Sequence, residues 1–246
     1  MASSEHGQQA HEEPDPLTAA LPYVVPYGVF ALLTTLAQYL PDWKTALYAV
    51  KVLAVGACLW SYRRQFSEVR VRFTPAIFVA VLVGLAVIAV WIGLDRYYPQ
   101  SGSEWRAFFE GVRVFEHPEK MEAGFNPFAA PQLMPPGLAI VFRLLGAVLL
   151  VPIFEELTFR SWLLRQAIRL DFKSVPIGAF TWLSFVLTAV LFGLTHREWL
   201  AGILCGLAFN GLMCRRKDIF LCMVAHATAN LALGVWVLAR SEWGFW

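Results

Sequence analysis

Charged residues are scarce in this chain of 246 residues. Asp, Glu, Lys and Arg together make up 15% of the sequence, whereas soluble domains contain about 25%. Apolar residues account for 58%, including 19 Phe and 10 Trp. A chain of this length cannot hide so much apolar surface, and several runs reach the ~20 residues that a helix needs to cross a bilayer. The composition therefore excludes a soluble globule and a disordered chain, and it indicates an integral membrane protein.

Basic clusters and cysteine motifs are scarce as well. The net charge is only +2, and no basic patch with interleaved aromatic residues is present, so we expect no nucleic-acid partner. The four cysteines have no CxxC spacing, and we interpret them as small buried hydrophobes rather than disulfides or metal ligands. Residues 1–20 contain no Lys or Arg, which argues against a cleavable signal peptide. We expect a disordered tail over 1–20 and a single transmembrane domain over 21–246.

Seven apolar segments predict membrane-spanning helices, at 22–40, 43–62, 75–94, 137–155, 176–196, 199–214 and 218–239. The predicted fold class is all-α, a polytopic bundle of about seven to eight membrane helices. Lys and Arg concentrate in the loops after the second, fourth and sixth segments. By the positive-inside rule this places the N-terminus in the cytoplasm and the C-terminus on the opposite side. The expected location is the cell (inner) membrane.

The one long connection, 95–136, contains aromatic residues at three- and four-residue steps between Trp105 and Phe115. This pattern predicts one amphipathic helix that lies in the membrane interface. A proline-rich stretch follows it. The connection can simply cover the bundle, or it can act as a lid that guides substrate.

Ionisable residues inside membrane segments cost at least about 2.5–3.5 kcal/mol each, so each needs a reason. The first cluster is the sequence EELTFR at 155–160. Glu156 and Arg160 are four residues apart, share a helix face and can pair. Glu155 is then free to accept a proton from water. The alternative is that both acids only cap the cytoplasmic end of the fourth segment.

Two further clusters contain histidine. Phe192 and His196 share a helix face at the end of the fifth segment, where a lone histidine is often only an interfacial residue. His226 and Asn230 lie one turn apart in the seventh segment and offer two donors to an oxyanion, although they can also form an interhelical hydrogen-bond pair. Together with Glu155 they form a set able to activate water and stabilise a tetrahedral intermediate.

The remaining polar residues have simpler interpretations. Arg143 lies near the outer end of its segment and can snorkel to the interface. Asn210 and the pair Gly202 and Gly206 are typical of helix packing. Lys51 has no explanation from the sequence.

The order Glu-Glu-x-x-x-Arg, Phe-x-x-x-His and His-x-x-x-Asn resembles the CPBP family of intramembrane glutamic proteases, the CAAX-protease and bacteriocin-processing (Abi) group. The motif-bearing core is 137–239. The resemblance implies an all-helical membrane fold and peptide-bond hydrolysis. It also implies a water activated by Glu155 with help from His196, and an oxyanion held by His226 and Asn230. We expect no metal and no other cofactor. The run 151–154 resembles the bacterial exosortase-associated branch of the family.

We therefore predict an intramembrane endopeptidase that cuts near the C-terminus of a membrane-anchored or lipidated protein with a CAAX-like or sorting tail. Glu155 is the expected general base, and Glu156 with Arg160 is expected to orient it. Two alternatives stay open. One is a zinc-dependent membrane hydrolase that uses His196, His226 and a glutamate as ligands. The other is a non-catalytic membrane scaffold or immunity-type protein. The expected partners are the substrate protein or peptide and the lipid bilayer.

The predicted segments place Glu155 and His196 on opposite sides of the membrane, ~30 Å apart if both helices span the bilayer. The two residues can meet in one of two ways. The fourth helix can extend to about residue 169, or the turn at 197–199 can be sunk within the bundle.

Overall fold

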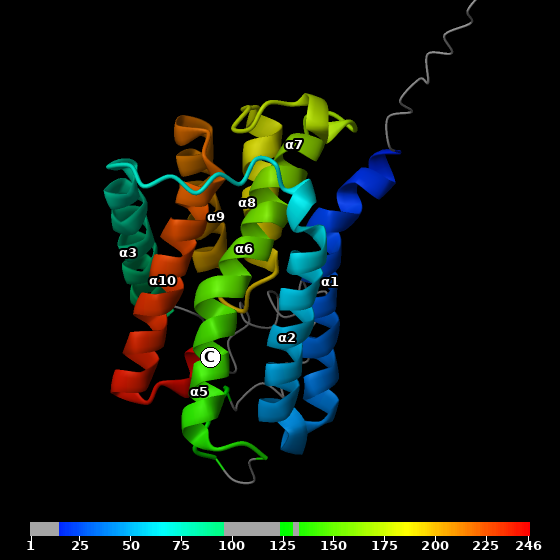
Figure 1. Ribbon diagram of the computed structural model, residues 1–246. Coiled ribbons are helices and arrows are strands. Elements are labelled where there is room, and N and C mark those ends of the chain that lie inside the picture. Colours follow the sequence, from blue (N-terminus) through cyan, green and yellow to red (C-terminus); the bar gives the residue numbers. More distant parts are fainter. Residues whose placement is uncertain (1–14, 96–123, 130–132) are drawn as a thin grey trace, which may run out of the picture.

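The computed structural model describes residues 15–95, 124–129 and 133–246, and the regular elements in these ranges are helical (Figure 1). The predicted interfacial helix lies outside the described residues. The main helices are α1 (Pro16–Tyr39), α2 (Lys44–Tyr62), α3 (Ala76–Asp95), a continuous helical segment over Pro136–Gln166, α8 (Trp182–Leu194), α9 (Trp199–Arg216) and α10 (Ile219–Arg240). Short 3-10 turns are η1 (Pro41–Trp43), η2 (Arg63–Gln65), η6 (Phe172–Ser174) and η7 (Trp243–Phe245).

The seven helical segments correspond in position to the seven predicted spans. Within the described residues, five helical stretches are long and apolar enough to cross a membrane: Pro16–Tyr39, Pro41–Gln65, Ala76–Asp95, Pro136–Gln166 and Ile219–Arg240. Helix α8 is apolar but has only 13 residues. The all-α, polytopic class is therefore confirmed, and five of the seven predicted spans qualify by length and composition.

The first helix begins at Pro16, whereas the predicted span begins at residue 22. The Asp15 carboxylate accepts a hydrogen bond from the Thr18 backbone N–H at 3.4 Å, which caps the helix. Pro16 occupies the first helical position, where its missing N–H costs nothing. Residues 16–20, predicted to be part of the disordered tail, thus belong to α1.

The fourth membrane segment extends well beyond the apolar run 137–155 and ends close to residue 169, as the longer of the two predicted extents has it. It has 31 residues and consists of α5 (Pro136–Leu144), the π-helical η4 (Leu145–Leu150), α6 (Val151–Glu156), the π-helical η5 (Leu157–Leu163) and α7 (Leu164–Gln166). The predicted boundary at 155 is wrong because the charges there interrupt the apolar run, although the helix continues through them.

Both ways for Glu155 and His196 to meet are realised. The long segment places Glu155 in its interior, as Figure 1 shows for α6 between α5 and α7. Helix α8, at ~1.5 Å per residue, is about 20 Å long and shorter than the ~30 Å hydrocarbon core. The turn between α8 and α9, which contains His196, lies at mid-height of the bundle (Figure 1).

Glycines bring α8 and α9 into backbone contact. A Cβ atom on Gly202 would lie 2.8 Å from the Gly193 Cα, and one on Gly206 would lie 2.9 Å from the Ala189 Cα. The Asn210 amide donates to the Phe185 carbonyl oxygen at 2.8 Å. The predicted packing roles of Gly202, Gly206 and Asn210 are confirmed.

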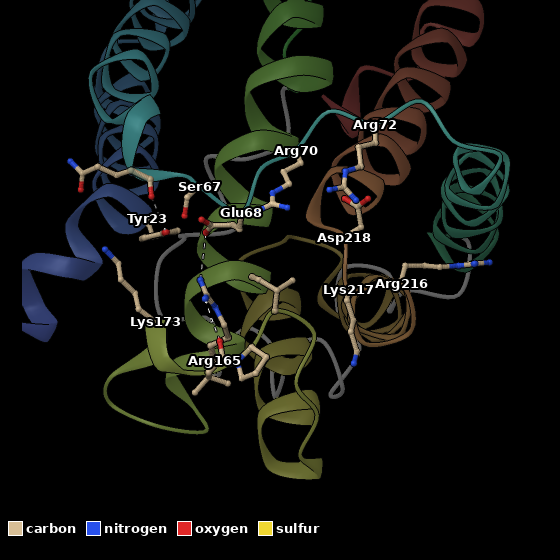
Figure 2. Close-up of a pocket in the computed structure, with 14 residues that line it drawn as sticks. Tyr23, Ser67, Glu68, Arg70, Arg72, Arg165, Lys173, Arg216, Lys217 and Asp218 are labelled. Carbon is tan, nitrogen blue, oxygen red and sulfur yellow. Dashed lines mark hydrogen bonds and ion pairs between the residues drawn. The ribbon is translucent and has the colours of Figure 1, made fainter.

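Helix α7 and the α2–α3 connection lie at one end of the bundle, opposite α5 (Figure 1). A pocket of about 560 Å³ at this end is lined by basic side chains from the α2–α3 connection, the segment after α7 and the end of α9: Arg70, Arg72, Lys173, Arg216 and Lys217 (Figure 2). Beside them Arg165 pairs with Glu68 at 3.5 Å. The loops predicted to share one side of the membrane are thus together. That this side is cytoplasmic stays a prediction.

Candidate active site

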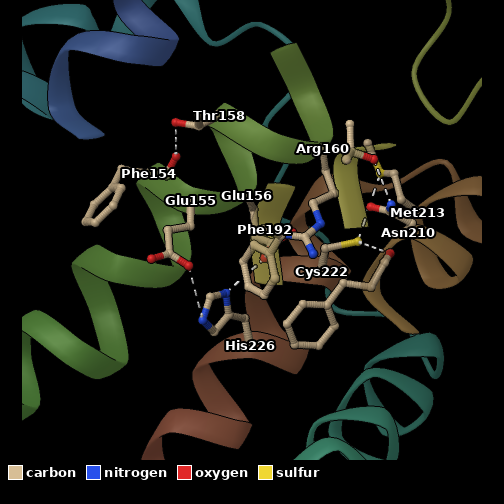
Figure 3. Close-up of polar contacts among 12 residues, drawn as sticks. Phe154, Glu155, Glu156, Thr158, Arg160, Phe192, Asn210, Met213, Cys222 and His226 are labelled. Atoms are coloured by element: carbon tan, nitrogen blue, oxygen red, sulfur yellow. Dashed lines mark hydrogen bonds and ion pairs between the residues drawn. The ribbon is translucent and has the colours of Figure 1, made fainter. Parts of the chain in front are cut away.

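Glu156 lies at the centre of a buried polar chain. Its side chain is fully buried, and its Oε1 accepts hydrogen bonds from Arg160 Nη1 at 3.2 Å and from His226 Nδ1 at 2.9 Å (Figure 3). The Arg160 guanidinium also lies 4.2 Å from the centre of the Phe192 ring. The predicted pairing of Glu156 with Arg160 is confirmed, and His226 on α10 joins it. The histidine is therefore held by a carboxylate whose charge Arg160 balances.

His226 faces both acids of α6. Because a carboxylate can only accept, the bond to Glu156 places a proton on the Nδ1 of His226. The other ring nitrogen, Nε2, lies 3.8 Å from Glu155 Oε2, which is too long for a direct hydrogen bond (Figure 3). Glu155 Oε2 is buried and has no hydrogen-bond partner among the described residues. Glu155 is thus the acid left without a cationic partner of its own, as the spacing predicted.

A proline explains how α6 is tied to α10. In the π-helical turn the Val151 N–H bonds to the Gly146 carbonyl, five residues back. The next N–H in this pattern would belong to residue 152 and reach Ala147, but Pro152 has no N–H. The Ala147 carbonyl instead accepts a hydrogen bond from Asn230 Nδ2 at 2.7 Å. Asn230 therefore satisfies a carbonyl that the proline leaves open, and its second N–H remains a donor.

His196 lies in the turn between α8 and α9. Its Nδ1 is 2.8 Å from the Phe192 carbonyl oxygen, which can only accept, so this nitrogen carries the proton. The ring packs against Phe192 and Trp91, with centroid distances of 4.6 and 5.5 Å. In the neutral ring Nε2 is therefore an available proton acceptor.

One cavity brings the predicted catalytic residues together. Its volume is about 280 Å³, and Glu155, His196, His226 and Asn230 all line it. Glu156 and Arg160 are not among its lining residues. Glu156 contacts the lining residue His226, and Arg160 contacts the lining residue Phe192. Much of the remaining wall is aromatic, with Tyr27, Phe30, Tyr48, Trp91, Phe192, Phe245 and Trp246.

Two charged residues of this cavity, Arg143 and Glu198, were not among the predicted site residues. Arg143, interpreted as a snorkelling residue, lines the same wall as Glu155. Only its presence as an ionisable group within an apolar segment could have drawn attention to it. Lys51, left unexplained, donates to Thr34 Oγ1 at 3.0 Å and lies 4.2 Å from the centre of the Phe30 ring.

The described residues show no ready-made metal site. In these ranges no group of three or more His, Cys, Asp or Glu side chains is placed to hold a metal ion. The four cysteines are free. The ligand set suggested for a zinc hydrolase is thus not assembled by these side chains.

The geometry defines a class of protein: a helical membrane protein with two adjacent glutamates, two histidines and an asparagine around a cavity between its helices. Residues 137–232 match the family model described as Rce1-like, type II CAAX prenyl endopeptidase Rce1-like. The matched segment contains all three motifs. This part of the chain is therefore similar to the Rce1-like CAAX endopeptidases, which are peptide hydrolases. Nothing in the match supports the exosortase-associated branch. No curated protein and no solved structure gives a significant match to the chain.

Proposed function

We propose that this protein is an intramembrane endopeptidase that uses a glutamate-activated water to cut near the C-terminus of a membrane-anchored or lipidated protein. The observation that carries the proposal is the position of Glu155. Among the described residues its carboxylate has no hydrogen-bond partner on Oε2, and it faces His226 Nε2 across 3.8 Å and borders a cavity inside the bundle. The second acid, Glu156, is already paired with Arg160. One acid is thus available for chemistry and the other for positioning.

In this mechanism a water molecule hydrogen-bonds to Glu155 and attacks the scissile carbonyl carbon while Glu155 takes its proton. The carbonyl oxygen becomes an oxyanion. It accepts hydrogen bonds from the second N–H of Asn230 and, when that nitrogen carries a proton, from His226 Nε2. The C–N bond then breaks as Glu155 returns the proton to the leaving amine. His196 helps to position the water through its free Nε2.

The roles of Glu156 and Arg160 differ from the initial expectation. They were expected to orient Glu155, but the hydrogen bonds run to His226 instead. We infer that they are positioning residues, which hold the His226 ring so that Nε2 faces Glu155. The conclusion follows from the single oxygen, Glu156 Oε1, that Arg160 and His226 share.

The cavity wall favours a substrate with apolar groups near the cut. Its aromatic rings offer contacts to aliphatic side chains or to a prenyl group. The matched family is described as acting on CAAX prenyl substrates. A C-terminal tail that follows a lipidated cysteine, or one that follows a membrane helix, meets both conditions.

The test uses the purified chain in liposomes with two quenched fluorescent peptides. One is farnesylated and ends in a CAAX sequence, and the other carries the same tail after a transmembrane helix. We expect cleavage of at least one peptide, and we expect Glu155→Gln to lower kcat by at least ~10³-fold, in the range of a lost general base. The thermal unfolding temperature should stay nearly unchanged, since the substitution removes no ion pair with Arg160.

Glu242→Gln is the matched control. Glu242 is an exposed carboxylate that accepts a hydrogen bond from Trp236 Nε1 at 2.7 Å, and it lies outside the cavity lining. This variant should keep wild-type activity. Failure of the wild type to cleave either peptide would overturn the proposal, as would a Glu155→Gln protein with more than a tenth of wild-type activity.

A further inference from the structure

Arg143 shares the cavity wall with the proposed general base. The residues that line the cavity from this helical segment are Arg143, Ala147, Val151 and Glu155, at steps of four. In a regular α-helix, twelve residues at ~100° each would leave Arg143 and Glu155 about 120° apart around the axis. They would then face different neighbours.

The π-helical η4 (Leu145–Leu150) removes this offset. A π-helical turn contains ~4.4 residues, so its six residues advance by only about 80° each. The total rotation from Arg143 to Glu155 then comes close to three full turns. The irregular segment thereby places a cation and the catalytic carboxylate in one row along the cavity.

In the part of the chain that the structure describes, the Arg143 guanidinium has aromatic neighbours and no acidic partner. Its Cζ lies 4.9 Å from the centre of the Tyr48 ring, 5.5 Å from that of Phe125 and 5.8 Å from that of Trp246. Its Nε is buried and lacks a hydrogen-bond partner, and within the described ranges no carboxylate pairs with it. The rings hold the guanidinium in place and leave its donors to an outside acceptor.

Positive and negative charges lie at different ends of the cavity. Glu155 and Glu156 lie on α6, whereas Arg143 lies on α5. A second cation, Lys51, has its Nζ 4.5 Å from the centre of the Tyr48 ring. The other acidic residue of the lining, Glu198, lies in the turn beside His196 and pairs with Arg197 at 3.8 Å. A peptide with a free carboxylate is attracted toward Arg143 and repelled from Glu155.

We propose that Arg143 binds the C-terminal carboxylate of the substrate and so sets the distance from the chain end to the scissile bond. This inference rests on the proposed function. A guanidinium and a carboxylate form charge-assisted, often bidentate hydrogen bonds, and the partly buried position of Arg143 strengthens them.

The spacing limits the length of the released tail. Arg143 and Glu155 are at most about 18 Å apart along the helix axis, at ~1.5 Å per residue. Both side chains tilt toward the helix N-terminus, so the separation of their ends is similar. An extended peptide covers ~3.3–3.6 Å per residue. Up to about five residues therefore connect the scissile bond to the carboxylate, and fewer are needed where the Arg143 side chain extends toward Glu155.

The test compares two versions of whichever liposome peptide the wild type cleaves, one with a free C-terminal carboxylate and one with a C-terminal amide. For the wild type we expect kcat/KM to be about 10- to 100-fold higher for the free acid, mainly through KM. Arg143→Gln should remove the preference, and Arg143→Lys should restore part of it. Lengthening the tail beyond about eight residues should also remove it.

Arg240→Gln is the control, because Arg240 likewise stacks on a ring, 4.9 Å from the centre of Trp236, but does not line the cavity. It should keep the preference for the free acid. Equal cleavage of acid and amide by the wild type would overturn the inference while the proposed function stands. A preference that persists in Arg143→Gln would overturn it as well. Loss of all cleavage in the wild type concerns the proposed function instead.

Discussion

Replacing Glu156 by glutamine tests the buried polar chain most directly. Gln keeps an oxygen that can accept the proton of His226 Nδ1, now 2.9 Å from Glu156 Oε1. The substitution removes the negative charge that balances Arg160, which is fully buried and 3.2 Å away. The variant therefore separates the charge of this residue from its role as a hydrogen-bond acceptor.

The magnitude follows from the burial of both partners. Removing one member of a buried ion pair costs about 3–5 kcal/mol, because the other charge stays unpaired. The retained hydrogen bond to His226 favours the lower end, about 3 kcal/mol. For a chain of this size each kcal/mol shifts the unfolding temperature by about 2–4 °C, so we expect a decrease of about 6–12 °C.

A second variant tests whether the unpaired charge of Arg160 causes the loss of stability. Arg160→Met in the Glu156→Gln background removes the unpaired charge and places an apolar side chain beside two aromatic rings. The centres of the Phe192 and Phe209 rings lie 4.2 and 5.3 Å from the Arg160 Cζ. At least half of the lost stability should return. Thermal unfolding of the detergent-solubilised proteins, followed by tryptophan fluorescence, measures both effects. A decrease in unfolding temperature of less than about 2 °C for the single variant would contradict this explanation, as would a double variant no more stable than the single one.

Three other predictions concern packing, metal dependence and orientation. Gly202→Ala should lower the unfolding temperature by several degrees, because the new Cβ would lie 2.8 Å from the Gly193 Cα. Gly211→Ala in the same helix meets nothing within 4 Å and should be neutral or stabilising. Cleavage should persist after exhaustive chelation, whereas the zinc-hydrolase alternative requires loss of activity and its recovery on adding zinc. A reporter that fluoresces only in the cytoplasm should be bright on the N-terminus and dark after Trp246, and the reverse pattern would contradict the predicted orientation.

Sequence spacing predicted the interactions that lie within one helix. Glu156 and Arg160 pair because residues four apart on a helix are neighbours. The helix ends were less predictable, since an apolar run stops at Glu155 while the helix continues to Gln166. Hydropathy treats buried charges as a boundary. In this protein Glu156 is paired with Arg160 and His226 inside the bundle, so the helix need not end at these charges.

The sequence by itself determined the membrane class, the all-helical fold and the set of polar residues that apolar surroundings do not explain. Those conclusions depend on composition and on local periodicity, which are properties of single segments. Only the tertiary structure decided that His226 contacts Glu156 and that Asn230 replaces the N–H missing from Pro152. It also decided that Arg143 faces the same cavity as Glu155. The physical reason is that these contacts depend on how α10 packs against an irregular helix, whose π-helical turn rotates side chains away from their regular α-helical positions.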